Sequence, residues 1–148
     1  MGLNLRFHAH GDEIRSVFTP RNEHVGFKGV IHGGLLATVL DEILVWACAV
    51  PTGQFAFCAE LTVRFLNPVQ PNQQLNLIAT LTDNKRGKLL IAEGRIENEA
   101  GILCATATGK YIPIPVSKIG GMMEELVGGT HPFTLASTQR VDSSNPIQ

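Results

Sequence analysis

Two groups that could do chemistry lie close together in the segment GVIHGGLLATVLDEILVWACAV, residues 29–50. Gly33 and Gly34 stand directly before an apolar run with helical spacing. The first N–H groups of a helix lack intrahelical partners and carry the positive end of its dipole. Glycine has no Cβ, so a ligand oxygen can approach such N–H groups closely, as the polarisation of a carbonyl requires. The alternative interpretation is a glycine turn that enters a tightly packed helix.

The same run carries two adjacent carboxylates, Asp41 and Glu42. An unpaired buried charge is costly, so a carboxylate in a buried helix must be paired or must face a cavity. Successive helical residues point about 100° apart, so the two side chains do not share one environment. Two alternatives stay open. One carboxylate pairs with a residue such as Arg64, or one lines a cleft as general base or nucleophile toward the group that the Gly33 amide polarises.

Other reactive sites are not indicated. The sequence contains no G-x-S-x-G, no G-x-x-x-x-G-K-[ST], no G-x-G-x-x-G after a strand and no H-E-x-x-H. His8 and His10 share a strand face, but no third ligand is signalled, so we expect no metal site. We also expect no organic cofactor.

The elements that must position these groups follow from apolar periodicity. The spacing from Gly33 to Val50 predicts one helix of about 17 residues, ended by Pro51, Thr52 and Gly53. Apolar residues occupy most of its circumference, which predicts burial nearly all round.

The chain after the helix alternates with the period of β-strands. In FCAELTVRF, Phe57, Leu61 and Val63 fall on one face and Cys58 on the other. Further strands are expected in QLNLIATLTD, LLIAEGRIEN and ILCATATGKYIPI, and one or two shorter strands before the helix in EIRSVFTP and VGFKGV. These elements predict an α+β fold, in which an antiparallel sheet of five or six strands packs on one long helix.

The composition and charge of the chain restrict the classes of protein to which it can belong. The formal net charge is −1, from 12 basic and 13 acidic residues, so no electrostatic footprint for nucleic acid or an anionic membrane is present. The three cysteines lie in apolar runs and no signal-peptide apolar region is visible, so we expect a cytoplasmic protein with reduced thiols. We assign one domain to residues 1–115 and expect a weakly structured tail over 116–148, which is rich in glycine and without period.

A composite motif adds a resemblance to this interpretation. The pattern G-x-x-H-G-G-x-x-A-x-x-x-D is matched by Gly29, His32, Gly33, Gly34, Ala37 and Asp41. Together with the strand that ends VRFLNPV, it resembles the hotdog-fold acyl-CoA thioesterases of the phenylacetic-acid-degradation type, over residues 13–113. The resemblance implies that the sheet wraps around the helix as in the hotdog fold. It also implies that the Gly33 N–H holds the thioester carbonyl oxygen, that Asp41 activates water or attacks the carbon, and that His32 braces the loop.

The resemblance further implies an assembly and a binding surface. Members of the family are homodimers or homotetramers in which Asp41 of one chain would face Gly33 of another, and Gly34 would contact the substrate. Cys58 stands where relatives often carry a hydroxyl that places the water, and a thiol is a weaker donor. Gly26 stands where relatives often carry Asn or Gln, so we consider whether a nearby loop residue, Asn22, Glu23 or His24, substitutes for it.

One further group of charges could belong to the binding surface. The turn NKRGK carries Lys85, Arg86 and Lys88. These side chains either form a solvated hairpin tip or contact the phosphates of coenzyme A.

We therefore expect an acyl-CoA thioesterase that needs no cofactor. The alternative is a hotdog module that binds acyl-CoA without turnover. A hydratase of the same fold is disfavoured because the sequence has no D-x-N-P-x-H loop. The sequence does not specify the acyl group, nor whether the carrier is coenzyme A or an acyl-carrier protein.

Overall fold

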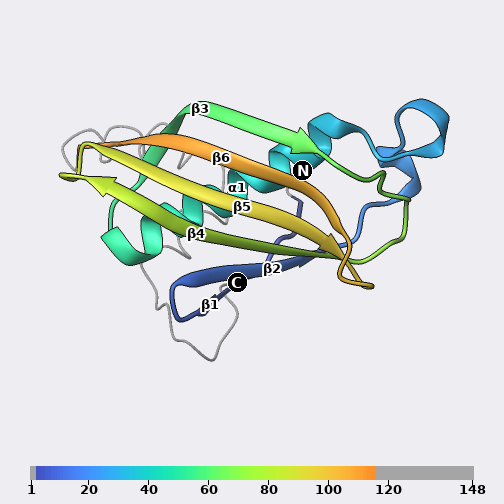
Figure 1. Cartoon of the computed structure of the whole chain (residues 1–148), viewed down its shortest axis with the longest axis horizontal. Helices are drawn as coiled ribbons and strands as arrows, with labels where there is room; N and C mark the ends of the chain where they lie inside the picture. The colour runs from blue at the N-terminus through green and yellow to red at the C-terminus, as the bar shows by residue number, and fades with distance from the viewer. Residues whose placement is uncertain (1–2, 116–148) are drawn as a thin grey trace, which may run out of the picture.

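The computed structural model describes residues 3–115. One long helix packs against a six-stranded antiparallel sheet, which confirms the predicted α+β architecture (Figure 1). The elements are β1 (Phe7–His10), β2 (Glu13–Phe18), the short turns η1 (Asn22–His24) and η2 (Phe27–Gly29), α1 (Gly33–Thr52), β3 (Ala56–Phe65), β4 (Leu75–Lys85), β5 (Leu89–Asn98) and β6 (Leu103–Pro113). The weakly structured tail expected over 116–148 lies outside the described residues.

The strand order is β1-β2-β4-β5-β6-β3. The chain leaves the sheet after β2, crosses behind it as α1, and returns at the opposite edge as β3 (Figure 1). Strands β4, β5 and β6 then fill the space between as a meander with antiparallel pairing throughout. Among the described residues, β3 therefore pairs on one side only, with β6.

One expected strand is wrong. The segment VGFKGV forms η2, in which Lys28 has a left-handed backbone (φ 56°), and its ends meet only through the isolated bridge between Val25 and Ile31. A non-glycine residue in this conformation cannot continue an extended strand, so the segment folds as a loop before the helix.

Helix α1 is longer than predicted and ends at Thr52. Proline lacks an N–H, so Pro51 removes a single helical hydrogen bond near the end without stopping the helix. The end comes at Gly53, whose left-handed backbone (φ 67°) lets its N–H bond the carbonyl of Ala49 at 2.8 Å.

The prediction that α1 is buried nearly all round is wrong for a single chain. The side toward the sheet is fully buried, with Val39, Leu40, Ile43 and Leu44 at 0% exposure. On the other side, Leu35, Val45 and Ala49 are half-buried and Thr38 is exposed. The helix is long and apolar enough to cross a membrane by length and composition alone, a test that the core helix of a soluble protein also passes.

A β-bulge changes the predicted faces of β3. Cys58 pairs with Tyr111 and Glu60 pairs with Lys110, so Ala59 is an extra residue opposite β6. The predicted strict alternation, which placed Cys58 and Leu61 on opposite faces of the sheet, is therefore wrong. Cys58 and Leu61 are both half-buried, whereas Phe57 is 52% exposed. The extra residue brings Cys58 to the helix side of the sheet.

Candidate active site

Among the described residues, the N-terminus of α1 leaves one backbone N–H without a hydrogen-bond partner. The His32 Nδ1 atom accepts from the Gly34 N–H at 2.8 Å, and the His32 carbonyl accepts from the N–H groups of Leu35 and Leu36 at 3.0 and 3.4 Å. The Gly33 N–H has no hydrogen-bond acceptor within the part of the chain that the structure describes. The first turn therefore leaves a single donor at the positive end of the helix dipole, at Gly33.

His32 is the N-cap of α1. Besides the Gly34 contact, its backbone N–H donates to the His24 carbonyl at 3.1 Å, which ties the helix start to η1. A Cβ at Gly26 would lie 3.3 Å from the His32 ring, so the loop closes directly over this cap. Gly34, expected to contact substrate, has its N–H engaged by His32 in this arrangement.

A shallow apolar cavity of about 270 Å³ adjoins Gly33. It lies between the start of α1 and the segment that follows β3, and its lining is Val30, Ile31, Gly33, Leu36 and residues 65–69. The Phe65 ring lies over the glycine, since a Cβ at Gly33 would come within 3.1 Å of Phe65 Cζ. The close approach of the Phe65 ring thus provides a structural reason for glycine at this position.

Asp41 is half-buried and has a partner that the sequence analysis missed. The Tyr111 hydroxyl donates to Asp41 Oδ1 at 2.7 Å, across 70 residues of sequence. The alternative that paired a carboxylate with Arg64 does not describe Asp41. A weak signal for Tyr111 was present, because it follows the small inward residues Ala105, Ala107 and Gly109 on β6.

Two thiols lie near this pair: Cys58 is close to Asp41 and Tyr111, and Cys48 is close to Tyr111 and Cys58. Burial raises the pKa of the Cys58 thiol, and the negative charge of Asp41 raises it further. Burial, with a smaller contribution from Cys58, raises the pKa of Cys48 to about 12. Because the thiolate is the nucleophilic form of cysteine, neither side chain is activated for attack at neutral pH. Among these side chains, the carboxylate of Asp41 is therefore the candidate reactive group.

One chain does not bring Gly33 and Asp41 to the same atom. They are eight residues apart on one helix, which is about 12 Å along its axis at the usual rise per residue. A thioester carbonyl that accepts from the Gly33 N–H is therefore out of reach of Asp41 in the same chain. A site that uses both groups must take them from two copies.

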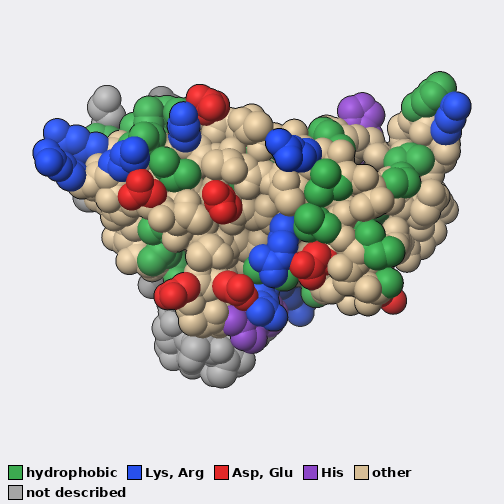
Figure 2. Space-filling model, in the orientation of Figure 1, with side chains coloured by type: hydrophobic (Ala, Val, Ile, Leu, Met, Phe, Trp, Pro, Cys, Tyr) green, Lys and Arg blue, Asp and Glu red, His purple; other side chains and the backbone are tan. Residues whose placement is uncertain are grey.

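The basic side chains of the turn between β4 and β5 lie far from Gly33. Lys85, Arg86 and Lys88 are exposed, and Arg86 and Gly87 make the turn with left-handed backbones. A Cβ at Gly87 would lie 4.0 Å from Gln54, just beyond the C-terminal end of α1. Figure 2 shows lysine and arginine side chains gathered at this end of the molecule. Within one chain, the structure does not bring the turn and the Gly33 amide together.

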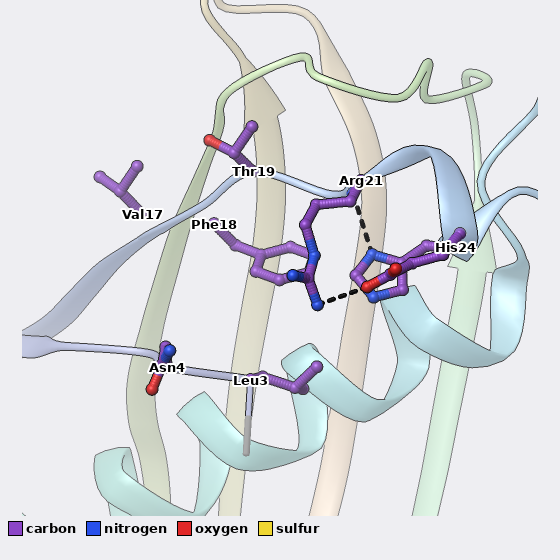
Figure 3. Close-up of a pocket in the computed structure, with 8 residues that line it drawn as sticks. Leu3, Asn4, Val17, Phe18, Thr19, Arg21 and His24 are labelled. Carbon is purple, nitrogen blue, oxygen red and sulfur yellow. Dashed lines mark hydrogen bonds and ion pairs between the residues drawn. The ribbon is translucent and has the colours of Figure 1, made fainter. Parts of the chain in front are cut away.

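The loop residues considered as substitutes for Gly26 have other partners. His24 Nδ1 accepts from the Arg21 N–H at 2.9 Å, Glu23 pairs with the Arg21 guanidinium at 2.5 Å, and Asn22 accepts from Asn72 at 3.3 Å. Figure 3 shows Arg21 and His24 directed toward each other on the wall of a cavity of about 550 Å³ between residues 3–4, the end of β2 and η1. Neither Gly33 nor Asp41 lines that cavity.

No group of three His, Cys, Asp or Glu side chains is placed to hold a metal ion in the described residues. The His8 and His10 rings lie 6.5 Å apart on β1.

Comparison with known proteins identifies relatives. A family model described as the thioesterase superfamily matches residues 28–105. An uncharacterized protein of Schizosaccharomyces pombe is 27% identical over 101 residues, which cover 64% of this chain and 57% of that protein. The chain thus spans little more than half the length of this curated relative.

Solved structures share the fold at low identity. A Streptococcus mutans protein bound to acetyl CoA has a TM-score of 0.69 and 16% identity, with 75% of this chain and 89% of that chain covered. The Escherichia coli PaaI protein from the phenylacetic acid degradation operon has a TM-score of 0.69 and 21% identity, with coverages of 76% and 80%. A hypothetical thioesterase of Streptococcus pneumoniae with coenzyme A has a TM-score of 0.68 and 17% identity, with coverages of 74% and 88%. The expected hotdog fold is confirmed.

Proposed function

The chain belongs to the thioesterase superfamily, and on that premise we propose that it hydrolyses an acyl-CoA thioester, as an enzyme of the phenylacetic-acid-degradation type. Water is consumed, the bond between the acyl carbon and sulfur breaks, and the products are the free acid and the thiol of coenzyme A. The observation that carries the proposal is the unpartnered Gly33 N–H beside an apolar cavity at a helix N-terminus.

The Gly33 N–H would donate to the thioester carbonyl oxygen. As a nucleophile adds, negative charge develops on that oxygen, and a preorganised donor at the positive end of a helix stabilises it. The apolar lining from Leu36 and Phe65 would receive the acyl group. Asp41 would activate the attacking water as general base, or attack the acyl carbon itself.

We propose that the working unit is a homodimer or homotetramer, in which each site takes Gly33 from one copy and Asp41 from another. Three features support a second copy. Gly33 and Asp41 are too far apart within one chain, β3 has an unpaired side among the described residues, and one side of α1 is only partly covered. A long open edge strand and a half-exposed apolar helix side are both stabilised by pairing with another copy.

Coenzyme A as the carrier is supported by the related structures whose names include acetyl CoA and coenzyme A. The exposed charges of Lys85, Arg86 and Lys88 would contact its phosphates from the turn between β4 and β5.

A binding module without turnover is a second candidate. The close packing of Phe65 over Gly33 and the bond between Tyr111 and Asp41 give both residues a structural role. Such a module would bind acyl-CoA at the same cleft and release no thiol.

The test is a panel of aliphatic and aromatic acyl-CoAs assayed for release of free thiol. We expect the parent to turn over at least one class, and Asp41→Asn to lose about 10²–10⁴ in kcat with KM nearly unchanged, since general-base catalysis is of that order. The amide still accepts from Tyr111, so the thermal midpoint should be close to that of the parent.

The matched control is Glu42→Gln, which removes the neighbouring half-buried carboxylate. It should cost far less in kcat. Binding of acyl-CoA by a parent that hydrolyses no member of the panel would favour the binding module. A fully active Asp41→Asn would remove Asp41 from the mechanism.

A further inference from the structure

We propose that Tyr111 is a positioning residue, whose hydroxyl holds the Asp41 carboxylate in one orientation for reaction. The inference rests on the proposed function, in which Asp41 acts at the acyl carbon. It assigns a role to a residue that neither the motif nor its spacing indicated.

The geometry restricts Asp41 at one oxygen. The Tyr111 hydroxyl lies 2.7 Å from Oδ1 and 3.5 Å from the Asp41 backbone carbonyl, so it contacts side chain and helix together. The terminal torsion of an aspartate is broad, and rotation would otherwise exchange the two oxygens. A hydrogen bond to Oδ1 restricts rotation of the carboxylate, so that Oδ2 would be the oxygen that acts on the water or the thioester.

The Tyr111 ring is itself fixed. Its side chain is fully buried, at 0% exposure, so it does not contact substrate from the cleft. The ring folds back over Gly109 on the same strand, where a Cβ would lie 2.9 Å from both Cζ and the hydroxyl oxygen. The absence of a side chain at Gly109 thus allows the ring to lie flat on β6 and to direct its hydroxyl at α1.

The hydroxyl remains a donor at any working pH. Burial raises the pKa of Tyr111 above its usual range, and its hydrogen bond to Asp41 and the charge of that carboxylate raise it further. Tyr111 therefore keeps its proton at neutral pH and remains a donor to Asp41. Its contribution is confined to holding the carboxylate.

Cys58 is a second side chain near the Asp41 carboxylate. It pairs with Tyr111 across the strands and is close enough to Asp41 for the carboxylate to raise the pKa of its thiol. A thiol is a weaker hydrogen-bond donor than a phenol. Tyr111 is therefore the stronger restraint on Asp41.

The first test is Tyr111→Phe, which keeps the ring and its packing and removes only the hydroxyl. We expect kcat to fall about 10- to 100-fold, the cost of a small misplacement of a reacting group. KM should be nearly unchanged, because Gly33 and the cavity are untouched. The matched control is Ser16→Ala, which removes another buried hydroxyl, one without a hydrogen-bond partner in the described residues. It should leave kcat as in the parent.

A double-mutant cycle separates positioning from a structural role. If Tyr111 acts through Asp41, adding Tyr111→Phe to Asp41→Asn should cost no further activity. Where the rate of Asp41→Asn is too low to measure, Asp41→Glu serves as the background. It keeps a carboxylate in a displaced position, so Tyr111→Phe should again cost less than in the parent. A residue that only supports the fold would reduce activity by the same factor in every background.

Two outcomes overturn the inference: full activity of Tyr111→Phe, and equal losses in both backgrounds. Failure of the proposed function is seen separately, as full activity of Asp41→Asn alone. A Tyr111→Phe variant that loses activity only because it unfolds would appear as a lowered thermal midpoint with equal losses in both backgrounds, and would also count against positioning.

Discussion

The Gly33 N–H and the Asp41 carboxylate lie on one helix, eight residues and about 12 Å apart along its axis. The donor has no acceptor among the described residues, and the carboxylate accepts a hydrogen bond from Tyr111 on β6. The two groups are therefore too far apart along the helix to act on one atom from the same chain.

The first prediction removes the Gly33 donor without removing the helix. Gly33 is the first residue of α1, a position where proline is well tolerated, and His32 before it is already extended (φ −61°, ψ 130°), as a following proline requires. Gly33→Pro should fold and should lose about 10²–10³ in kcat, the cost of one such donor. Thiol release and the thermal midpoint are the measurements.

Gly33→Ala is the control for that substitution. Its Cβ meets the same Phe65 ring at 3.1 Å, but the N–H is retained. The ring is 54% exposed and can move aside. Gly33→Ala should therefore remain much more active than Gly33→Pro, and equal activities of the two variants would show that the N–H is not the donor.

The second prediction tests the shared site by complementation. A mixed dimer of Gly33→Pro and Asp41→Asn chains would contain one site with both defects and one site with neither. Co-refolding equal amounts of the two inactive variants should restore about a quarter of the parent activity, because half of the dimers are mixed and each has one intact site. Refolding either variant alone is the control. If mixed dimers form and activity is not recovered, the two groups do not act together across two chains. Either both would act within one chain, or they do not form a common site.

The third prediction concerns the basic turn. Replacing Lys85, Arg86 and Lys88 by Gln keeps Gly87 and removes the charges. If these side chains contact the phosphates of coenzyme A, KM for acyl-CoA should rise several-fold and its dependence on salt should disappear, since exposed ion pairs are weak and screened. Lys110→Gln, on the exposed side of β6, is the control. An unchanged KM would leave the turn a solvated hairpin tip.

The fourth prediction concerns stability in alkali. The pKa of Cys48 rises from 9.0 in its unperturbed state to about 12 in the fold, and that of Tyr111 is also raised. Above pH 9 the unfolded chain releases protons that the folded chain retains, so the thermal midpoint should fall as the pH rises toward 12. Tyr111→Phe should have a shallower fall over this range. An unchanged thermal midpoint from pH 9 to 12 would contradict the burial of these groups.

Much of the architecture could be predicted because it follows from the local periodicity of apolar residues. The helix from Gly33 and the strands after it follow from spacings of 3.6 and 2 residues, and β-strands that follow one another with short turns pair antiparallel. The motif HGG before the helix also marked the free donor, since unsatisfied N–H groups at a helix start follow from the geometry of any α-helix.

Departures from that periodicity could not be predicted in the same way. The bulge at Ala59 turns Cys58 toward the helix, and nothing in the alternation of FCAELTVRF indicates an extra residue there. A bulge depends on how β3 registers against β6, and this register is set by the packing of the whole sheet.

The sequence by itself determined which candidate groups lie on the helix: an amide at Gly33 and a carboxylate at Asp41, both on one apolar segment. Only the tertiary structure decided what each of them contacts. Tyr111 reaches Asp41 because β6 lies over α1 and because Gly109 leaves room for the ring, a contact across 70 residues. The physical reason is that backbone periodicity is a local property of the chain, whereas the partner of a buried polar group is chosen by which strands the fold brings beside it.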